Sequence, residues 1–574
     1  MMYLALFNTD MILMVLAVIA VLSGFCLYCP SRFISFMNKF SGNKQASAAF
    51  FLLFIFPAVS LGQTAGDYQS RGTGNWNTPG TWQKYNGSVW QNNQGYPGQN
   101  PGTGTVTIRD GHTVTLNVSP TNPVGNLVIG EGSSGTLQTD NSNRILNTSG
   151  NLSVSDGATF NLGRITLTVS GTTSINGSLT DSHNNGSASF NGQFIINSNG
   201  SFSTTNNSPF TFSGGITNNG TFSKGGSGTA TFAGSQAING SGPLSFSGGN
   251  VSISSGSSVT NSGIVTIAGV LNGDDAGSQW INGANATLNY GNGSVPMSTG
   301  SLVATATNNT VNYNGTVNQS VASIIYSNLI ISGSGTSTLT GEVTVENTIT
   351  LASGTLSISA NTLILNGSPI AGSGSLNTTT TSSLVFGGTS SGVFVPSNVS
   401  NLRNLTINNP GGVTINNNLT LSSAGELTLT SGILDIGSNT LSIANTAATA
   451  ITNNSGAFVN ITTGALRRTL PRNLSGTGND YFFPVGEGGV YKGLNLIDVN
   501  TGSPEPVLSV SVSPAGALDG DNITIGPVDS RYWTLIKVSG NLTSARIELF
   551  ESGLSSQKTI GMSNSVSGPY VSIG

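Results

Sequence analysis

Apolar and small polar residues alternate through most of this chain, in short runs separated by glycine and asparagine. The alternation has a period of two, as in VSIS and TLTV, and its apolar members are mainly Val, Ile, Leu and Phe. A period of two places every second side chain on the same face of a strand, where β-branched and aromatic residues are favoured. The pattern therefore predicts an all-β protein built from many short strands.

A repeat of about 21 residues runs through residues 145–300. Six asparagines mark it, at spacings of 21, 21, 21, 22 and 21: Asn176, Asn197, Asn218, Asn239, Asn261 and Asn282. Periods in this range indicate a solenoid, because stacked rungs bury apolar side chains that one rung cannot bury alone. We predict a right-handed parallel β-helix (β-solenoid) with rungs of about 21 residues. Ile196 and Ile238 are expected in its core, and the asparagines in equivalent turns.

A longer duplication follows this repeat. LASGTLSISANTLIL (351–365) aligns without gaps with LTSGILDIGSNTLSI (429–443). Residues 305–460 are therefore predicted to form duplicated solenoid blocks.

The two flanking regions differ from the repeats in composition. Residues 66–135 contain three of the five tryptophans and are predicted to form a β capping module. Residues 63–463 hold 19 charged residues in 401, whereas residues 464–574 hold 17 in 111. We expect residues 464–574 to be a separate β-sandwich-like domain with its own core.

Two apolar segments open the chain. Residues 11–28 form an apolar run long enough to span a membrane. Residues 37–62 have a basic start, a short apolar core and small residues before the end at Gly62, which is the form of a secretory signal. We predict a signal peptide at 37–62, cleaved before Gln63, with residues 1–36 as an upstream extension. The alternative is a transmembrane helix that anchors the chain in the membrane.

Composition limits the class of protein. Only 7% of residues are charged, and the net charge of −4 is spread along the chain, so no basic surface for nucleic acid is expected. The two cysteines, Cys26 and Cys29, lie in the first apolar segment, so the exported chain contains none. A long exported chain without disulfides fits a Gram-negative repeat protein, located outside the cell or at its surface.

Candidate catalytic groups are few. His112 and His183 lie in different modules, and ordinary zinc spacing is absent after residue 63. A polysaccharide-active β-helix enzyme would need paired carboxylates, and Asp274-Asp275 is the adjacent acid pair of the solenoid. Neighbouring residues of a strand point to opposite faces, so the two would not converge on a substrate there. We therefore expect no enzyme and no small-molecule cofactor.

Two candidate binding sites remain. Trp76, Trp82 and Trp90 would suit a sugar-stacking platform, as in a carbohydrate-binding module, although packing of the capped end of the solenoid is the preferred interpretation. Asp519 and Asp521 place carboxylate oxygens at alternate positions, which suits calcium, although a polar turn is the preferred interpretation. The predicted partners are extracellular glycans or surface proteins.

Several segments carry a family resemblance: GNWNTPGTWQ with VTIRDGHTVTLN, VNYNGTVNQSV with YSNLIISGSG, and RRTLPRNLSGTGNDYFFPVG with RYWTL. Together they resemble the large repetitive surface proteins that Gram-negative bacteria export by the type IX secretion pathway. The resemblance implies an adhesin-like or scaffolding surface protein that acts through an extended solenoid face. Such proteins end in a sorting domain, and nothing like one precedes Gly574, so a truncated product or another export route is expected.

Overall fold

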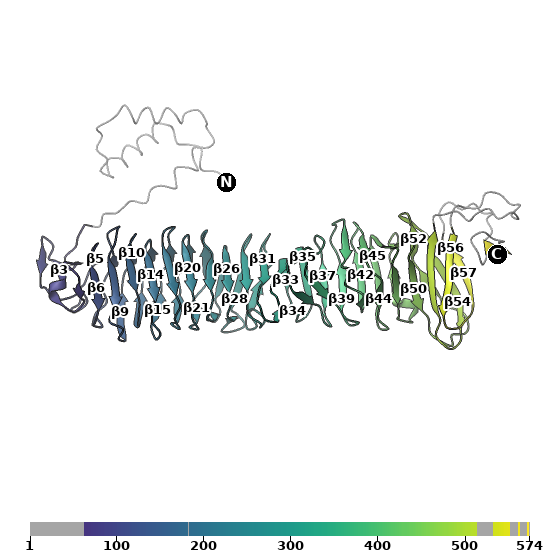
Figure 1. Cartoon of the computed structure of the whole chain (residues 1–574), viewed down its shortest axis with the longest axis horizontal. Helices are drawn as coiled ribbons and strands as arrows, with labels where there is room; N and C mark the ends of the chain where they lie inside the picture. The colour runs from purple at the N-terminus through teal and green to yellow at the C-terminus, as the bar shows by residue number, and fades with distance from the viewer. Residues whose placement is uncertain (1–61, 182, 514–531, 551–560, 563–570, 573–574) are drawn as a thin grey trace, which may run out of the picture. The chain divides into compact units, whose positions relative to one another are not determined.

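The computed structural model describes residues 62–181, 183–513, 532–550, 561–562 and 571–572. This part of the chain is an all-β solenoid of about 17 turns with rungs of about 21 residues, which confirms the predicted β-solenoid and its repeat. The strands of successive rungs lie side by side along the stack (Figure 1). Helical geometry in this part is limited to η1 (Pro79–Thr81) and η2 (Ala448–Ala450), and no helix in it is long and apolar enough for a membrane span. The predicted signal peptide and the upstream apolar run lie outside the described residues, except for Gly62.

One rung of the first half contains three short strands that belong to three different sheets. An example is β13 (Thr173–Ile175), β14 (Ser178–Asp181) and β15 (Ser187–Phe190). Each strand pairs in parallel with its equivalent in the next rung, as Ile175 does with Ile196 and Leu179 with Phe202. Inward residues alternate with outward ones, so the inward residues of all rungs form one continuous core.

Three sheets line the first half of the solenoid, and their strands pair in parallel except at the two antiparallel pairings of the cap. One has thirteen strands between β4 (Trp90–Asn92) and β30 (Ser301–Val303), and another has seven, from β9 (Arg144–Thr148) to β27 (Leu271–Gly273). The third, here called the long sheet, runs through the pairings from β2 (Gly74–Asn75) to β48 (Ile451–Asn453). Because the long sheet continues through residues 305–460, parallel stacking extends across the predicted duplicated blocks.

Aromatic rings fill the middle of the first half. Phe202 in β17 (Ser201–Thr204) and Phe222 in β20 (Thr221–Lys224) are register partners, and their ring centroids lie 5.0 Å apart. Both rings are almost completely buried. Burial of each aromatic side chain contributes roughly 2–3 kcal/mol, which offsets the entropy of ordering such glycine-rich rungs.

The predicted equivalence of the six asparagines is wrong. Asn218 lies opposite Ile196 of the preceding rung, whereas Asn239 lies opposite Thr217 of its preceding rung. Successive side chains of a strand point to opposite faces, so a shift of one residue reverses the orientation. Asn218 is therefore buried and Asn239 exposed, although the aliphatic positions Ile196 and Ile238 both lie in the core as predicted.

Two of the marked asparagines do stack. Asn261 in β25 (Ser258–Asn261) and Asn282 in β28 (Gln279–Asn282) are register partners and both fully buried. The Asn261 Nδ2 donates to the Asn282 Oδ1 at 2.8 Å. The Asn282 Nδ2 donates in turn to the Thr310 carbonyl at 3.0 Å, so both amides are hydrogen-bonded inside the core, as a buried polar group must be.

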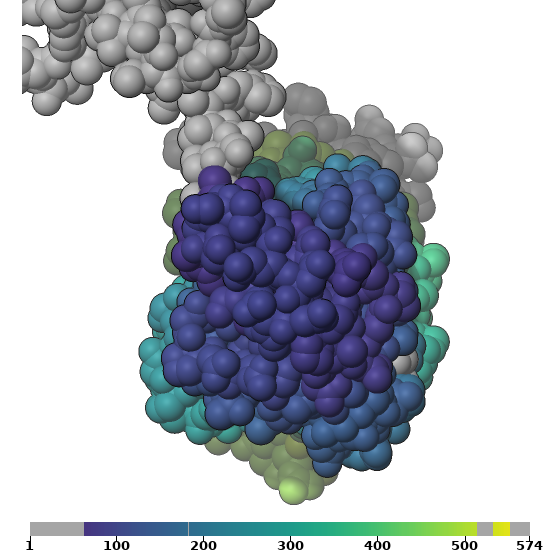
Figure 2. All heavy atoms as spheres, turned by 90° about the vertical axis from the view of Figure 1, so that its left-hand side faces the viewer, coloured from purple at the N-terminus to yellow at the C-terminus, as the bar shows by residue number. Residues whose placement is uncertain are grey.

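The N-terminal end of the stack is covered by the capping module. Strand β1 (Tyr68–Ser70) pairs in parallel with β5 (Val106–Ile108) on one side and antiparallel with β3 (Trp82–Tyr85) on the other. In the view onto this end, the residues coloured purple spread over much of the cross-section (Figure 2). The antiparallel strands thus replace the missing preceding rung.

The C-terminal region is not separated from the solenoid at residue 464. Strand β50 (Ala465–Thr469) pairs in parallel with β47 (Thr440–Ile443) of the solenoid and antiparallel with β55 (Val507–Ser513). The buried core continues without a break into these strands. The change in composition therefore marks the change from parallel to antiparallel pairing, and the expected independent core is absent from the described residues.

Candidate functional site

The tryptophans of the capping module are the first candidate site. Trp76 and Trp82 are completely buried, with their ring centroids 5.0 Å apart at an interplanar angle of 71°. The Trp76 Nε1 donates to the Pro97 carbonyl at 3.0 Å, and the Trp82 Nε1 donates to the Trp76 carbonyl at 2.7 Å. Neither ring has a free face for a sugar. These two residues form the core of the cap.

Trp90 is the tryptophan of this group that reaches the surface. It begins β4 and lies opposite Tyr85 of β3, with ring centroids 5.3 Å apart. Both rings are half-buried, and neighbouring Val89 is 57% exposed. The predicted three-ring platform is thus reduced to one aromatic pair at the edge of the thirteen-stranded sheet.

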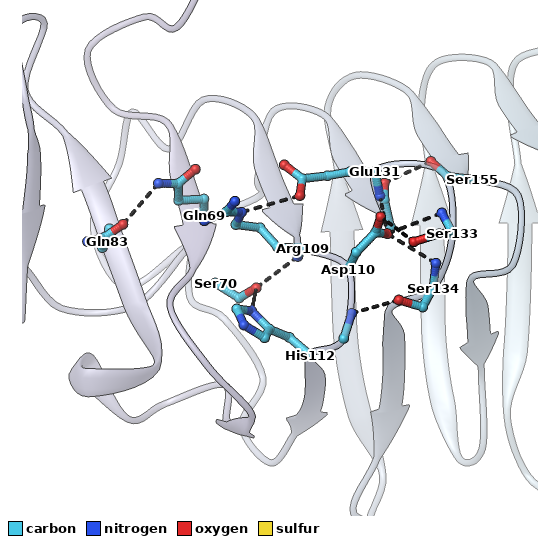
Figure 3. Close-up of polar contacts among 12 residues, drawn as sticks. Gln69, Ser70, Gln83, Arg109, Asp110, His112, Glu131, Ser133, Ser134 and Ser155 are labelled. Carbon is cyan, nitrogen blue, oxygen red and sulfur yellow. Dashed lines mark hydrogen bonds and ion pairs between the residues drawn. The ribbon is translucent and has the colours of Figure 1, made fainter.

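A polar cluster ties the cap to the first rungs (Figure 3). The buried Ser70 Oγ lies 2.8 Å from the His112 Nδ1 and accepts a hydrogen bond from the Arg109 backbone N–H, also at 2.8 Å. A serine beside a histidine is a nucleophile only if it can reach a substrate. Ser70 is fully buried, so its hydroxyl is not available for nucleophilic attack. The contact instead holds the Arg109 turn in place.

Asp110, in the same turn as Arg109, forms hydrogen bonds to the following rung. Its carboxylate accepts hydrogen bonds from the backbone of Glu131 at 2.7 Å and from the Ser133 hydroxyl at 2.7 Å (Figure 3). These bonds, the one from the Glu131 backbone first, lower the pKa of Asp110 to about 2. Because its carboxylate is hydrogen-bonded to the turn at residues 131–134, Asp110 does not complete a catalytic triad with Ser70 and His112.

Asp274 and Asp275, the predicted acid pair of the solenoid, are likewise hydrogen-bonded to a neighbouring rung. Asp275 accepts hydrogen bonds from the Ser255 hydroxyl and from backbone N–H groups including that of Gly256 at 3.0 Å, which lower its pKa to about 2. Asp274 accepts from the Ser252 hydroxyl at 2.6 Å. A general acid must carry a proton near neutral pH. Asp275 is ionised there, so it does not provide the acid that glycoside cleavage requires.

No metal site was found in the described part of the chain. There, no three His, Cys, Asp or Glu side chains come close enough together to hold an ion. Asp519 and Asp521, the predicted calcium ligands, lie outside the described residues.

The buried charges lie inside the solenoid. Asp181, Thr204 and Lys224 are successive register partners in the long sheet, and all three side chains face inward. Burial lowers the pKa of Lys224 to about 8 and raises the pKa of Asp181. The Lys224 Nζ donates to the Gly225 carbonyl at 3.0 Å. Both side chains lie inside the apolar core and not at the surface, so their role is structural.

Lys224 makes stability depend on pH in a defined window. Its pKa falls from 10.5 in the unfolded chain to about 8 in the fold, so between these values the unfolded chain binds a proton that the folded chain has released. Unfolding free energy should therefore increase with pH across this window, by about 2–3 kcal/mol. Chemical denaturation of wild type and Lys224→Met between about pH 7.5 and 10.5 tests this. The rise should be missing from Lys224→Met and kept in Lys84→Met, and equal pH profiles for all three would contradict it.

Sequence reasoning missed the outward residues of the long sheet. Seven consecutive rungs place hydroxyl or amide side chains opposite one another in a single column, here called the polar column: Thr180, Ser203, Ser223, Ser245, Thr266, Asn289 and Asn312. All seven are partly or fully exposed. In the sequence these residues are the outward Ser, Thr or Asn of short alternating strands such as SFST, TFSK and TLNY, and only the register shows that they align.

No family model, curated protein or solved structure matches this chain.

Proposed function

We propose that this chain is a non-enzymatic extracellular protein, adhesin-like or scaffolding, that acts through the exterior of its solenoid. The observation that carries the proposal is the regular outer surface of the rungs. Asp110 and Asp275 are hydrogen-bonded to turns of neighbouring rungs, and Asp181 and Lys224 are buried. A regular surface that offers many equal contacts suits adhesion, because linked weak contacts add up to strong attachment. Export is supported by the signal-like segment and by the resemblance to type IX cargo.

Adhesion and catalysis can be tested on the same preparation. Beads coated with the chain from Gln63 onward should adhere to extracellular polymers and to cell surfaces, whereas beads coated with an unrelated protein should not. Incubation of the soluble chain with the same polymers should release no reducing ends and no unsaturated sugars. Turnover would contradict the non-enzymatic assignment, and a failure to adhere to any surface would contradict the adhesive one.

A carbohydrate-binding role for the cap is the second candidate, favoured by the half-exposed Tyr85 and Trp90 rings. Aromatic faces at a binding site are frequent hot spots, where truncation costs more than about 1 kcal/mol, or at least fivefold in Kd. Trp90→Ala should then weaken binding of soluble oligosaccharides by that factor, and Trp90→Phe should weaken it less. Titration calorimetry measures both, and equal affinities for Trp90→Ala and wild type would exclude the site.

A further inference from the structure

The polar column lies within an almost uncharged stretch of the chain. Residues 165–341 contain four Asp, Glu, Lys or Arg residues, which are Asp181, Lys224, Asp274 and Asp275. Asp181 and Lys224 point into the core, and the other two aspartates follow β27 of the seven-stranded sheet. The outward face of the long sheet between β14 and β31 (Thr310–Tyr313), here called the polar face, therefore carries no charge.

A second row of polar residues accompanies the polar column. Ser178, Ser201 and Thr221 are register partners two positions before it, and Thr287 and Thr310 resume the row further along. Residues two apart on a strand are separated by about 6.6–6.8 Å, and neighbouring rungs by about 4.8 Å. The polar face is thus a two-row lattice of hydroxyls and amides, interrupted in one row by Pro243 and Ile264.

Hydrogen bonds along the polar face fix the orientation of its side chains. The Asn312 Nδ2 donates to the Asn289 Oδ1 at 2.9 Å, and the Ser201 hydroxyl donates to the Ser178 hydroxyl at 3.2 Å. Small side chains on a rigid parallel sheet have little freedom left to lose when a ligand binds. The face is therefore organised before binding.

Aromatic rings do not contribute to the polar face. The aromatic residues of its strands, Phe202, Phe222, Phe246, Tyr290 and Tyr313, are all buried on the inner side. Contacts to this face are hydrogen bonds from neutral groups, each worth about 0.5–1.5 kcal/mol net. A ligand must touch many rungs to bind firmly, so short ligands should bind weakly and long repetitive ones strongly.

We propose, building on the adhesive function above, that the polar face binds a neutral polysaccharide whose chain lies along the solenoid. Sugar hydroxyls donate and accept hydrogen bonds, as do the Thr, Ser and Asn side chains, and a polymer of identical units meets identical contacts at each rung. A charged polymer would be desolvated here without any counter-charge. Binding should therefore be nearly independent of salt up to about 1 M.

The closing experiment compares two faces of the same rungs. In the exported chain, Ser203→Lys with Ser223→Lys places two long cations on the polar face. The matched control, Ile195→Lys with Thr217→Lys, places the same two cations on the thirteen-stranded sheet, at outward register partners of the same two rungs. Thermal melting shows whether both variants remain folded. The probes are insoluble cellulose, chitin and mannan, and soluble neutral glucans of increasing length.

The polar-face variant should lose at least tenfold in affinity for the polymer that the wild type binds, and the control should change little. Affinity of the wild type should rise with glucan length. Equal loss in both variants, or loss in the control alone, would overturn the assignment of the face while leaving adhesion intact. Salt-sensitive binding to charged polymers only would overturn the neutral ligand. Failure of the coated beads to adhere to anything would instead reject the proposed function itself.

Discussion

Ile216→Asp is expected to disrupt the first half of the solenoid, with a loss of several kcal/mol in unfolding free energy. Ile216 is 1% exposed and pairs in register with Phe194 and Ile238 on either side. A carboxylate at this position is surrounded by apolar side chains and has no partner, so it either remains as a buried charge or takes up a proton at high cost. Changes of this kind belong to the largest single-residue effects known in proteins.

Thr217→Asp provides the matched control, because Thr217 is the next residue of the same strand and faces outward. Its stability should stay within about 0.5 kcal/mol of the wild type. Thermal unfolding and hydrogen exchange measure both variants, and exchange should increase most in the rungs next to residue 216, because each rung contacts only its neighbours. A variant as stable as the wild type would show that Ile216 does not face the core.

Arg468→Met is expected to detach the C-terminal strands from the solenoid. Arg468 is fully buried, and its guanidinium donates to the carbonyls of Phe482 at 2.8 Å, Ala447 at 2.8 Å and Ala448 at 3.0 Å. It also lies over the Tyr481 ring at 5.2 Å. Burial lowers the pKa of Arg468 to about 10, so the side chain is still charged at neutral pH. The substitution removes these three hydrogen bonds, and a hydrogen bond to a charged group contributes about 1.5–3 kcal/mol.

Arg467→Met is the control for this prediction, since the Arg467 side chain lies on the opposite face of β50 and is only partly buried. Limited proteolysis and hydrogen exchange should show early opening of β51 (Tyr481–Phe483) and β54 (Leu494–Thr501) in Arg468→Met, but not in Arg467→Met. Arg468→Lys should rescue only part of the loss, because an ammonium group cannot reach three separate carbonyls as a planar guanidinium does. Equal protection in all variants would show that the three contacts do not hold the two regions together.

The sequence predicted the β-solenoid because the contacts of a solenoid recur at a fixed distance along the chain. A strand period of two and a rung period of about 21 residues were enough to identify the strands, the stacking and core positions such as Ile196 and Ile238. The family resemblance and the predicted export stay predictions, as does the calcium loop at Asp519 and Asp521. Each depends on something other than the recurring pattern.

Register was decided only by the tertiary structure. An insertion or deletion of one residue in a turn leaves the average period almost unchanged, but it reverses which side chains face the core. That is why Asn218 is buried and Asn239 exposed, although both fit the same sequence repeat. The alignment of Ser203 with Ser223 in the polar column follows from the same register, which the periodicity could not supply.

Long-range contacts decided the candidate sites. The sequence could place Trp76, Trp82 and Trp90 in one module, but their roles depended on which strand of the cap covered which ring. Likewise, Asp275 stabilises a turn because the Ser255 hydroxyl of the preceding rung lies within hydrogen-bonding distance of its carboxylate. The sequence by itself thus determined the repeating strand, its length and its apolar face. The three-dimensional stack decided the partner of each polar side chain, because that partner comes from a neighbouring rung whose offset is set by turns of variable length.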